Sequence, residues 1–468
     1  MILEPIGVAT ILVGLFCVLL GDMTMVTVLA IVPVLGSAAA MFVGFANIQP
    51  AHVLLGFLAL GVITRKQELR AFIRALSPGE PGFWFVLLIA YGVLSAYFAP
   101  RLLTGVTQIV ALGSTVFGDT GSTVPLVPVS SNLTQSVYMI GNLVCFGLTL
   151  AVASTHRGFN AVLTGLIGYC VANIVFAVLD MATFATGTQW LLDFMRNAQY
   201  ALHTDAQIGN LKRIVGSFTE ASSFARSTLG VLAFSGTLWL SGYKRPLMGS
   251  IAAASVVLLF LSTSSTGVAG APLMLLILYA TAFSLSGRRR IRRVTAAAMI
   301  MVPLAMIAVA LLIAIDPVIS KTVYDYVDIV VLGKATSDSG IERSTWNTIA
   351  MQNFFDSWGF GVGLGTVRTS SFVMALLANV GIPGTIFYAA FAYTAFFKKR
   401  GVPGTLTSDV RLAARNGCFG LMIGDLLVSP VLDQGLFFCM LAAVCCAQPE
   451  RERSTQAVRA ATQLGATA

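Results

Sequence analysis

The chain has 468 residues, of which 56% are hydrophobic and only 10% are charged, and its mean hydropathy is +0.84. Soluble domains carry about 25% charged residues, so this composition excludes a soluble globular protein. The net charge is +9, and the length suits roughly a dozen membrane-crossing helices of about 20 residues each.

Thirteen apolar runs with the character of membrane spans follow one another along the chain. They predict an all-α fold, a polytopic transmembrane helical bundle of about 12–13 spans with a periplasmic loop domain that contains short helices. Residues 1–448 are expected to form this single membrane domain, and residues 449–468 a cytoplasmic tail. The runs lie at about 6–21, 23–45, 50–64, 83–99, 136–154, 159–183, 227–242, 247–262, 265–286, 294–316, 370–396, 412–429 and 434–448.

The first apolar run is predicted to be a span and not a cleaved leader. The start, Met1-Ile2-Leu3-Glu4-Pro5, lacks the basic segment and the small-residue cleavage site of a secretory signal peptide. The number of spans within residues 1–64 stays open. Three spans place the N-terminus outside, whereas two or four place it inside.

Basic residues predict the orientation of the bundle. Twenty of the 29 Lys and Arg residues fall in short segments after every second span, so they can share one face, which the positive-inside rule assigns to the cytoplasm. The C-terminus is then cytoplasmic. These residues are Arg65, Lys66, Arg70, Arg74, Arg157, Lys244, Arg245, Arg288, Arg289, Arg290, Arg292, Arg293, Lys398, Lys399, Arg400, Arg411, Arg415, Arg451, Arg453 and Arg459.

The opposite face carries three longer segments, at about 100–135, 184–226 and 317–369, where a polar site can lie. Within them, residues 190–196 have the pattern of an interfacial helix, and a soluble-type helix is expected near 340–356. Only nine basic residues fall on this face: Arg101, Arg196, Lys212, Arg213, Arg226, Lys321, Lys334, Arg343 and Arg368.

Neither the cysteines nor the histidines predict a metal or redox site. The seven cysteines lie in or beside apolar runs, and the adjacent pair Cys445-Cys446 is no CxxC motif, so we interpret all seven as small hydrophobic residues. His52, His156 and His203 are isolated, and no carboxylate cluster has metal-ligand spacing. No metal and no cofactor are therefore expected.

The segment 216–226, Gly-Ser-Phe-Thr-Glu-Ala-Ser-Ser-Phe-Ala-Arg, runs straight into an apolar span. On a helix, Glu220 shares a face with Ser223, and Ser222 shares a face with Arg226. A helix N-terminus with Ser or Thr caps explains most of this composition. It does not explain Arg226, because a cation near a helix N-terminus opposes the helix dipole, so we infer a bound anion there.

The segment 341–347, Ile-Glu-Arg-Ser-Thr-Trp-Asn, is followed by four alternate glycines in 359–365 and then by Arg368. Glycine lets the backbone approach a ligand closely and expose its N–H groups, and the next span begins near Ser370. Backbone donors, a helix N-terminus and an arginine suit phosphate oxygens. A flexible re-entry loop is the alternative, and no strand precedes the glycines as in a nucleotide-binding fingerprint.

A third polar segment, residues 261–267 (Leu-Ser-Thr-Ser-Ser-Thr-Gly), falls between two spans on the external face. A polar turn with small residues for close helix packing explains it equally well. Asp180 and Asp425 lie near span ends or polar neighbours. An ionisable residue in a span is a functional candidate by default, but we favour caps or interhelical bonds for these two.

In this order and on one face, the segments resemble the O-antigen polymerase and ligase superfamily, which includes Wzy-type polymerases and WaaL-type ligases. The family pattern has a Gly-Ser/Thr-Phe stretch leading into a span, an SR-like turn, a large periplasmic loop with an Arg before a Trp-bearing helix, a GxGxG segment and a span with N/E-x-G. The matching segments here are 216–226, 262–267, 343–346, 359–365 and 377–384, within a resemblance that covers about residues 135–448.

The resemblance implies a metal-independent glycosyltransferase that joins undecaprenyl-pyrophosphate-linked oligosaccharide repeat units at the periplasmic face of the bacterial inner membrane, in exopolysaccharide or O-antigen biosynthesis. Family ligases carry a His just after the Gly-rich loop, where this chain has Arg368-Thr369-Ser370-Ser371, and the SR-like turn lacks its Arg. A polymerase therefore fits better than an O-antigen ligase. A lipid-linked oligosaccharide flippase or other transporter is the remaining alternative, although the unusual charges gather at one face.

The implied chemistry assigns roles to the candidate residues. Negative charge on a departing pyrophosphate needs cations and N–H donors, and the acceptor hydroxyl needs a base. The expected partners are the lipid-linked oligosaccharide, membrane lipids, a chain-length regulator and other polysaccharide assembly proteins, and nucleic acid is not expected. The expected catalytic residues are Glu220, Arg226, Arg343 and Arg368, with Glu220 as the base. The expected substrate-binding residues are Arg213, Ser217, Ser223, Gly361, Gly363, Gly365 and Ser370.

Overall fold

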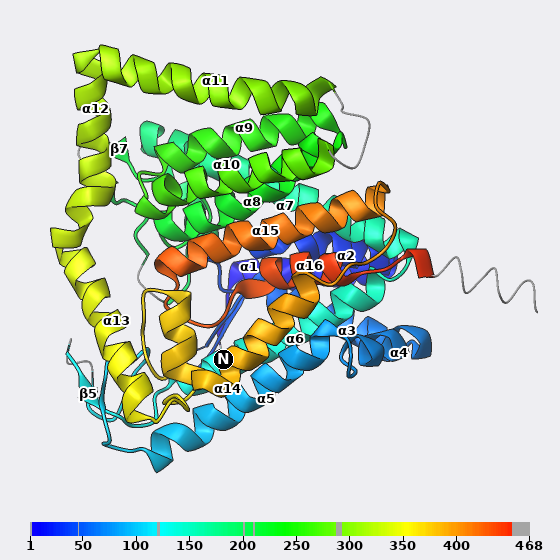
Figure 1. The fold of residues 1–468 in the computed structure, drawn as a ribbon. Coiled ribbons are helices and arrows are strands. Elements are labelled where there is room, and N and C mark those ends of the chain that lie inside the picture. Colours follow the sequence, from blue (N-terminus) through cyan, green and yellow to red (C-terminus); the bar gives the residue numbers. More distant parts are fainter. Residues whose placement is uncertain are drawn as a thin grey trace, which may run out of the picture.

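The protein is a bundle of helices that run between two ends of the molecule (Figure 1). The computed structural model describes residues 2–44, 46–118, 122–199, 202–208, 211–286 and 293–451. Helices account for 73% and strands for 4%, so the expected predominance of helix is confirmed.

The helices alternate in direction along most of the chain. The first half contains α1 (Pro5–Leu20), α2 (Asp22–Ile31), η1 (Val32–Val34), α3 (Pro50–Ile63), α4 (Lys66–Ala75), α5 (Pro81–Leu102), α6 (Ser131–Val152), α7 (His156–Thr186) and η2 (Gln189–Met195). The second half contains α8 (Ala221–Ser241), α9 (Arg245–Leu261), α10 (Ser265–Ser286), α11 (Arg293–Ile315), α12 (Pro317–Val327), η3 (Asp328–Leu332), η4 (Gly333–Thr336), α13 (Asp338–Asp356), α14 (Phe372–Phe396), α15 (Leu406–Val428) and α16 (Gly435–Cys446).

The strands are short and antiparallel. Strand β2 (Met41–Val43) lies between β1 (Ile2–Leu3) and β3 (Ala46–Ile48), with Ile2 opposite Phe42 and Met41 opposite Ile48. Two further pairs join β4 (Gln108–Ile109) to β5 (Val124–Pro125) and β6 (Gln207–Ile208) to β7 (Leu211–Lys212).

Several helices have the length and composition to cross a bilayer. Among the described residues, five qualify, namely α5, α6, α7, α10 and α14, and a sixth is counted if the bent pair Met299–Ile315 and Pro317–Leu332 forms one broken span. The two parts of that pair meet at 104°. Helices α1, α2, α3, α9 and α16 are apolar but shorter. The fold is therefore compatible with a multi-pass membrane protein.

Two expectations about the first 75 residues are wrong. The predicted span 23–45 is a helix that ends at Ile31, a short 3-10 turn and a β2–β3 hairpin, because Pro33 has no N–H to continue the helical ladder. The basic segment after residue 64 is not a loop but the amphipathic helix α4. Its Phe72 packs against Gly147 of α6, where a Cβ atom would lie 2.5 Å from the ring.

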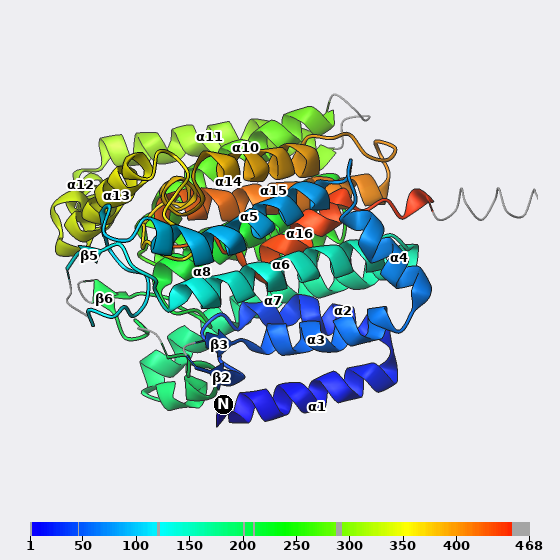
Figure 2. The ribbon, with the colours of Figure 1, turned by 90° about the horizontal axis from the view of Figure 1, so that it is seen from below.

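The predicted long segments 100–135, 184–226 and 317–369 gather at one end of the bundle. Figure 2 shows β5, β6, α12 and α13 at this end, which we call the outer end, and α4 at the opposite, inner end. The N-terminal strand also belongs to the outer end, because Asn197 Nδ2 donates to Glu4 at 3.3 Å. At the inner end, Lys398 Nζ donates to the Gly79 carbonyl at 3.2 Å. Basic segments far apart in sequence thus meet at the inner end.

The core follows α8, which packs between α9, α10 and α15 and is buried along most of its length. Aromatic rings fill the neighbouring layer, where Tyr169 stacks on Phe437 with 3.7 Å between ring centres and Phe85 stacks on Phe391 at 4.7 Å. Helix α8 begins at Ala221. Because the helix is buried, its first residues and Glu220 just before them are held in place at the outer end.

Candidate functional site

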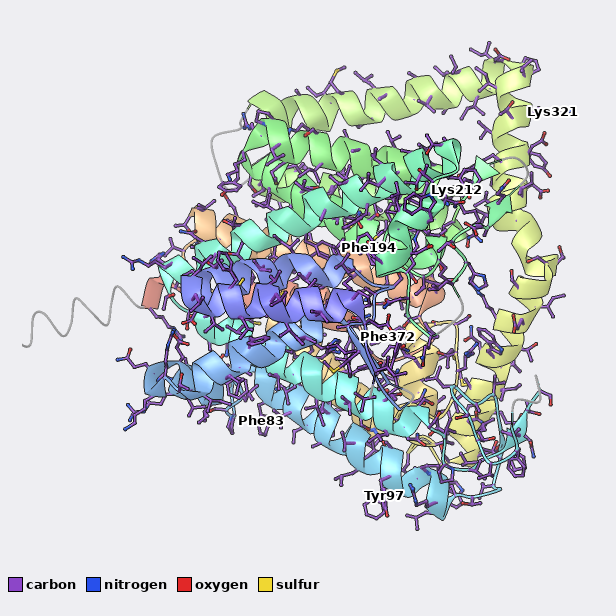
Figure 3. All side chains as sticks on the ribbon, turned by 180° about the vertical axis from the view of Figure 1, so that it is seen from behind. Phe83, Tyr97, Phe194, Lys212, Lys321 and Phe372 are labelled. Atoms are coloured by element: carbon purple, nitrogen blue, oxygen red, sulfur yellow. The ribbon has the colours of Figure 1, made fainter. Side chains whose placement is uncertain are left out.

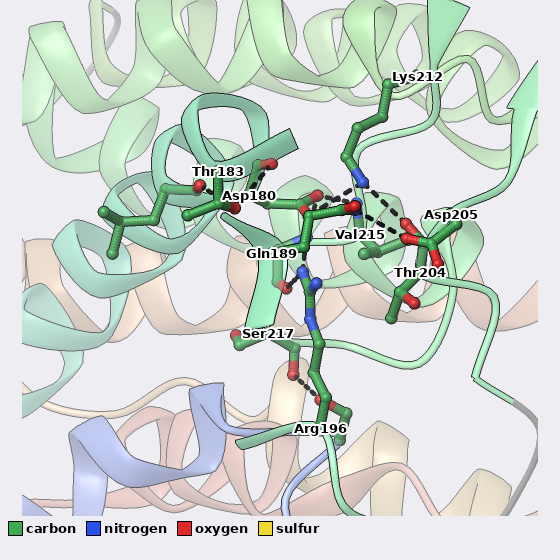
Figure 4. Close-up of polar contacts among 12 residues, drawn as sticks. Asp180, Thr183, Gln189, Arg196, Thr204, Asp205, Lys212, Val215 and Ser217 are labelled. Carbon is green, nitrogen blue, oxygen red and sulfur yellow. Dashed lines mark hydrogen bonds and ion pairs between the residues drawn. The ribbon is translucent and has the colours of Figure 1, made fainter. Parts of the chain in front are cut away.

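A buried carboxylate holds two of the outer-end cations. Asp180, near the end of α7, is fully buried and accepts from Arg196 Nη2 at 2.6 Å and from Lys212 Nζ at 3.1 Å (Figure 4). Its other oxygen accepts from the N–H groups of Val215 and Gly216 at 2.9 and 3.1 Å. These bonds tie η2, the β6–β7 hairpin and the segment before α8 to the end of α7. The sequence favoured a cap or an interhelical bond for Asp180, and the structure shows bonds that join it to other elements.

Arg226 is also neutralised within the protein. Its Nε and Nη2 atoms both bond the Asp425 carboxylate of α15, with Nη2 at 2.9 Å, and Nη2 reaches the Gln434 carbonyl at 2.9 Å. Gln434 Nε2 donates to the same carboxylate at 3.1 Å. The anion inferred beside Arg226 is therefore Asp425. This pairing corrects the reason for expecting a substrate anion at that position.

Three other arginines at the outer end lack such a partner. Among the described residues, the side chains of Arg213, Arg343 and Arg368 make no hydrogen bond or ion pair, and Arg213 Nε is buried without an acceptor. Burial lowers the pKa of Arg213, the charge of Glu220 raises it and the charge of Arg343 lowers it further. Glu220 and Arg343 are therefore each near enough to Arg213 to act on its charge, and we call these three residues the outer-end cluster.

Figure 3 shows a buried and an exposed lysine of the outer end: Lys212 lies within the β6–β7 region, and Lys321 projects from α12. The Lys212 side chain is 7% exposed, whereas Lys321 is an exposed residue. Arg101 lies apart from both, with Nη1 donating to the Tyr97 carbonyl at 2.6 Å. The side chain of Lys334 lies outside the described residues.

Glu220 occupies the N-cap position of α8, with an extended backbone at φ −154° and ψ 163°. Because it precedes the helix, the predicted helical face shared by Glu220 and Ser223 does not form, and Ser222 Oγ donates to the Glu220 carboxylate instead. Ser223 is half-buried. Ser217 is fully buried and donates to the Val34 carbonyl at 2.6 Å. Its hydroxyl is committed to the fold, which corrects its assignment to substrate binding.

The glycine-rich loop, residues 359–365, is buried for most of its length and bonded within the protein. The N–H of Gly361 donates to Ser357 Oγ at 3.0 Å and that of Gly363 to the Asn379 carbonyl at 3.0 Å. The Asn379 side-chain oxygen accepts from the N–H groups of Thr366 and Val367 at 3.0 and 3.1 Å. The N–H groups of Gly361 and Gly363 are therefore not free donors for phosphate, because protein acceptors already occupy them.

Glycine is needed in this loop for a different reason. Gly361, Gly363 and Gly365 have φ of 81°, 109° and 77°, and a Cβ atom on each would lie within 2.8 Å of backbone atoms of α14, α5 or α6. The loop inserts against α14 where that helix is broken at Gly381 (φ 59°). The loop fills the space beside this break and thereby fixes the position of the residues that follow it, including Arg368.

Arg368 lines a cavity of about 570 Å³ at the outer end. Its guanidinium carbon lies 5.2 Å from the ring centre of Trp346 on α13. Asn347, the next residue of α13, accepts from the Ser370 N–H at 2.9 Å and donates to Ser370 Oγ at 3.1 Å. Ser370 thus joins α13 to the start of α14. It positions this wall of the cavity through both its hydroxyl and its N–H.

One residue that sequence reasoning set aside lies beside the cluster. The N–H of His203 donates to the Thr219 carbonyl at 2.9 Å, which brings this exposed histidine next to Glu220. The two residues are joined through the β6–β7 hairpin, so no spacing pattern could reveal the contact.

The third polar segment is a tight turn between α9 and α10. Ser262 Oγ donates to the Leu259 carbonyl at 2.7 Å, and a Cβ atom on Gly267 would lie 2.6 Å from the same oxygen. These contacts fit the packing explanation. In the part of the chain that the structure describes, no three His, Cys, Asp or Glu side chains gather as a metal site requires, and the seven cysteines are free and buried.

Among the described residues, the outer end therefore offers three arginines that form no ion pair, with Glu220 near Arg213 and a polar cavity beside Arg368. This set can stabilise negative charge that develops on a bound group and can accept a proton nearby. Comparison with known proteins gives no match, either to a protein-family model or to a curated protein.

Proposed function

We propose that the chain is a polysaccharide polymerase that joins undecaprenyl-pyrophosphate-linked oligosaccharide repeat units at the periplasmic face of the inner membrane. The observation that carries this proposal is a set of outer-end arginines without an ion pair among the described residues, Arg213 and Arg343 with Glu220, and Arg368 beside the cavity. The basic inner end is then cytoplasmic. A count of 12–13 spans, as proposed here, includes shorter apolar helices such as α1, α3 and α16 besides the five long ones.

The arginine cluster suits the departure of a lipid pyrophosphate. An acceptor hydroxyl attacks the anomeric carbon of the donor sugar, a new glycosidic bond forms, and the bond to pyrophosphate breaks with its electron pair on the leaving group. Arg213 and Arg343 neutralise that charge, since guanidinium groups bind phosphate oxygens in pairs of hydrogen bonds. Glu220 takes the hydroxyl proton. Undecaprenyl pyrophosphate and a lengthened glycan are the products.

Arg226 has a positioning role in this scheme. Its guanidinium is bound to Asp425 and to the Gln434 carbonyl, so it holds α8 against α15 and thereby fixes Glu220. Gly361, Gly363 and Gly365 likewise hold the backbone that leads to Arg368. These residues support the site without contacting the pyrophosphate.

A ligase-type transfer is the second candidate, and one observation favours it. Family ligases place a histidine near the reacting groups, and His203 lies beside Glu220 here although it does not follow the glycine-rich loop. In that case His203 replaces Glu220 as the base, and the acceptor is a glycan on a different lipid. The roles of Arg213 and Arg343 are the same in both schemes.

The test is an assay in membranes that contain the full chain and a synthetic undecaprenyl-pyrophosphate repeat unit. Wild type is expected to form a ladder of lengthened glycans and to release undecaprenyl pyrophosphate. Removing a group that stabilises transition-state charge costs about 10²–10³ in rate, so Arg213→Ala and Arg343→Ala should lose the ladder. Lys321→Ala, an exposed cation on α12, is the matched control.

Three outcomes overturn the proposal. They are wild-type membranes that make no glycosidic bond, movement of the intact repeat unit across the bilayer without bond formation, and Arg213 and Arg343 variants with a normal ladder. The second outcome assigns the protein to the flippases.

A further inference from the structure

The cavity beside Arg368 has a lining unlike that of the arginine cluster. It is built from Arg368, from Glu342, Thr345 and Trp346 of α13, and from the strand-like segments 110–115 and 122–124. Its volume of about 570 Å³ lies within the usual range for small-molecule sites, roughly 300–1,000 Å³. From this lining we propose that the cavity is the acceptor subsite, which binds an uncharged glycan segment. This assignment rests on the proposed function.

The charges of the lining argue for a neutral ligand. Arg368 and Glu342 both face the cavity, so their charges cancel. A pyrophosphate placed there gains one cation and meets one carboxylate, whereas the outer-end cluster offers two cations, Arg213 and Arg343, beside one carboxylate, Glu220. The cavity is therefore the poorer place for the leaving group and a suitable one for hydroxyl groups, which interact with both kinds of charge.

The remaining lining matches the two surfaces of a sugar ring. Trp346 is half-buried and offers an aromatic surface, on which the C–H face of a sugar packs. Ser114, Thr115 and Thr345 add hydroxyl oxygens; the Ser114 and Thr345 hydroxyls already donate to Ser130 and to the Ile341 carbonyl, so they meet a ligand as acceptors. An aromatic anchor with several small hydroxyl side chains fits a glycan better than it fits a lipid chain.

The wall opposite α13 is rigid and does not form an anion cradle. The N–H of Leu112 donates to the Thr366 carbonyl at 3.1 Å, and the N–H of Arg368 donates to the Val110 carbonyl at 2.9 Å. This ladder joins segment 108–112 to the end of the glycine-rich loop and occupies these N–H groups. These two N–H groups are therefore not available to a ligand in the cavity.

Helix α13 connects the two sites. Trp346 lies one turn after Arg343 on this helix, and the Asn347–Ser370 bonds hold it in place. A glycan on Trp346 therefore has its end within one helical turn of Arg343, where the donor pyrophosphate is proposed to lie. The three-residue spacing of Arg343 and Trp346 on one helix is therefore consistent with an acceptor bound next to the donor.

The experiment measures glycan binding by the full chain in lipid nanodiscs, without any lipid-linked donor. The probes are linear neutral hexose tri- and tetrasaccharides, the host repeat unit freed of its lipid pyrophosphate, and inorganic pyrophosphate as competitor. Saturation-transfer NMR and calorimetry report binding. Loss of an aromatic anchor costs about 1–2 kcal/mol, so Trp346→Ala should weaken glycan binding roughly tenfold or more, and Trp346→Phe should weaken it less.

Matched variants separate the subsite from folding and from catalysis. Trp190→Ala changes an exposed tryptophan on η2 and should bind glycan as wild type does. Thr345→Trp adds bulk at an exposed position on the cavity wall and should block binding in a fully folded protein. Arg213→Ala should keep glycan binding while it loses the polymer ladder.

The subsite assignment is overturned if no glycan in the set binds wild type, if Trp346→Ala and Thr345→Trp bind as well as wild type, or if pyrophosphate displaces the glycan. Failure of the polymerase proposal gives a different result. Glycan then binds in a Trp346-dependent way, but wild-type membranes form no glycosidic bond.

Discussion

Two groups of arginines lie at the outer end, and they differ in what surrounds their charge. Arg196 and Arg226 each meet a buried carboxylate, Asp180 and Asp425, that comes from a different part of the chain. Arg213, Arg343 and Arg368 meet none among the described residues. The first group joins helices, whereas the second keeps its hydrogen-bonding capacity for a ligand. Proximity to the external face is thus a weaker sign of function than the absence of a counter-ion.

The largest effect is expected at Asp180. Asp180→Asn removes the carboxylate that pairs with Arg196 and Lys212, and both cations stay buried. Breaking a buried pair in this way costs about 3–5 kcal/mol, so the folded fraction in detergent should fall sharply. Thermal unfolding followed by size-exclusion chromatography measures the loss. Asp193→Asn, an exposed residue of η2, serves as the control and should unfold like wild type.

A similar loss of stability is expected for Arg226→Met, which leaves Asp425 buried and unpaired at a cost of about 3–5 kcal/mol. The double variant Arg226→Met/Asp425→Leu replaces the pair with apolar side chains and should regain most of the thermal midpoint. It should also regain polymer synthesis, because Arg226 then acts only through packing. A double variant that folds well but makes no polymer would move Arg226 into the group that contacts substrate.

Glu220 and His203 compete for the role of base, and single substitutions separate them. Glu220→Gln keeps an acceptor for Ser222 but cannot take up a proton, so polymer synthesis should fall by about 10²-fold without a change in the thermal midpoint. His203→Ala should leave synthesis close to wild type. Initial rates of undecaprenyl pyrophosphate release are the measurement, and the opposite pattern would favour the ligase-type scheme.

The smallest effect is expected for the ion pair of Arg411 and Glu450 at the inner end. Burial acts against ionisation of Glu450, but hydrogen bonds from Arg411 and Thr407 lower its pKa from 4.5 to about 2. A lowered folded-state pKa adds stability above pH 4.5 that is lost as the pH falls toward 2. The thermal midpoint of wild type should therefore fall over this window. Glu450→Gln should flatten that part of the profile, whereas Glu342→Gln should not.

The sequence predicted the broad architecture because hydropathy and charge are local properties. The apolar runs after residue 80 correspond to helices, and the three long segments share one end of the molecule. The exceptions to this prediction also have physical causes. Pro33 ends a helix inside a continuous apolar run, and the heptad-like spacing of Leu69, Phe72 and Ile73 in α4 was hidden among basic residues.

The site was less predictable because its decisive contacts are long-range. Arg226 and Asp425 are 199 residues apart, and nothing local to either residue indicates the pairing. Lys212 pairs with Asp180, whereas Arg213 next to it forms no ion pair among the described residues, a difference that no single sequence reveals. The glycine-rich loop was recognised, but its glycines fit a crowded backbone and not a ligand, and both situations select the same residue type.

The interlocking of the glycine-rich loop with α14 has a consequence for the evolution of this chain. The Ile382 N–H bonds the Gly359 carbonyl, Asn379 accepts from the N–H groups of Gly363 and Thr366, and a Cβ atom on Gly381 would lie 2.2 Å from the Gly359 oxygen. A change in either segment leaves the other without a fitting partner. Distant relatives should therefore keep the alternate glycines together with the Asn-x-Gly of α14, or lose both, and this paired signature should outlast overall sequence similarity.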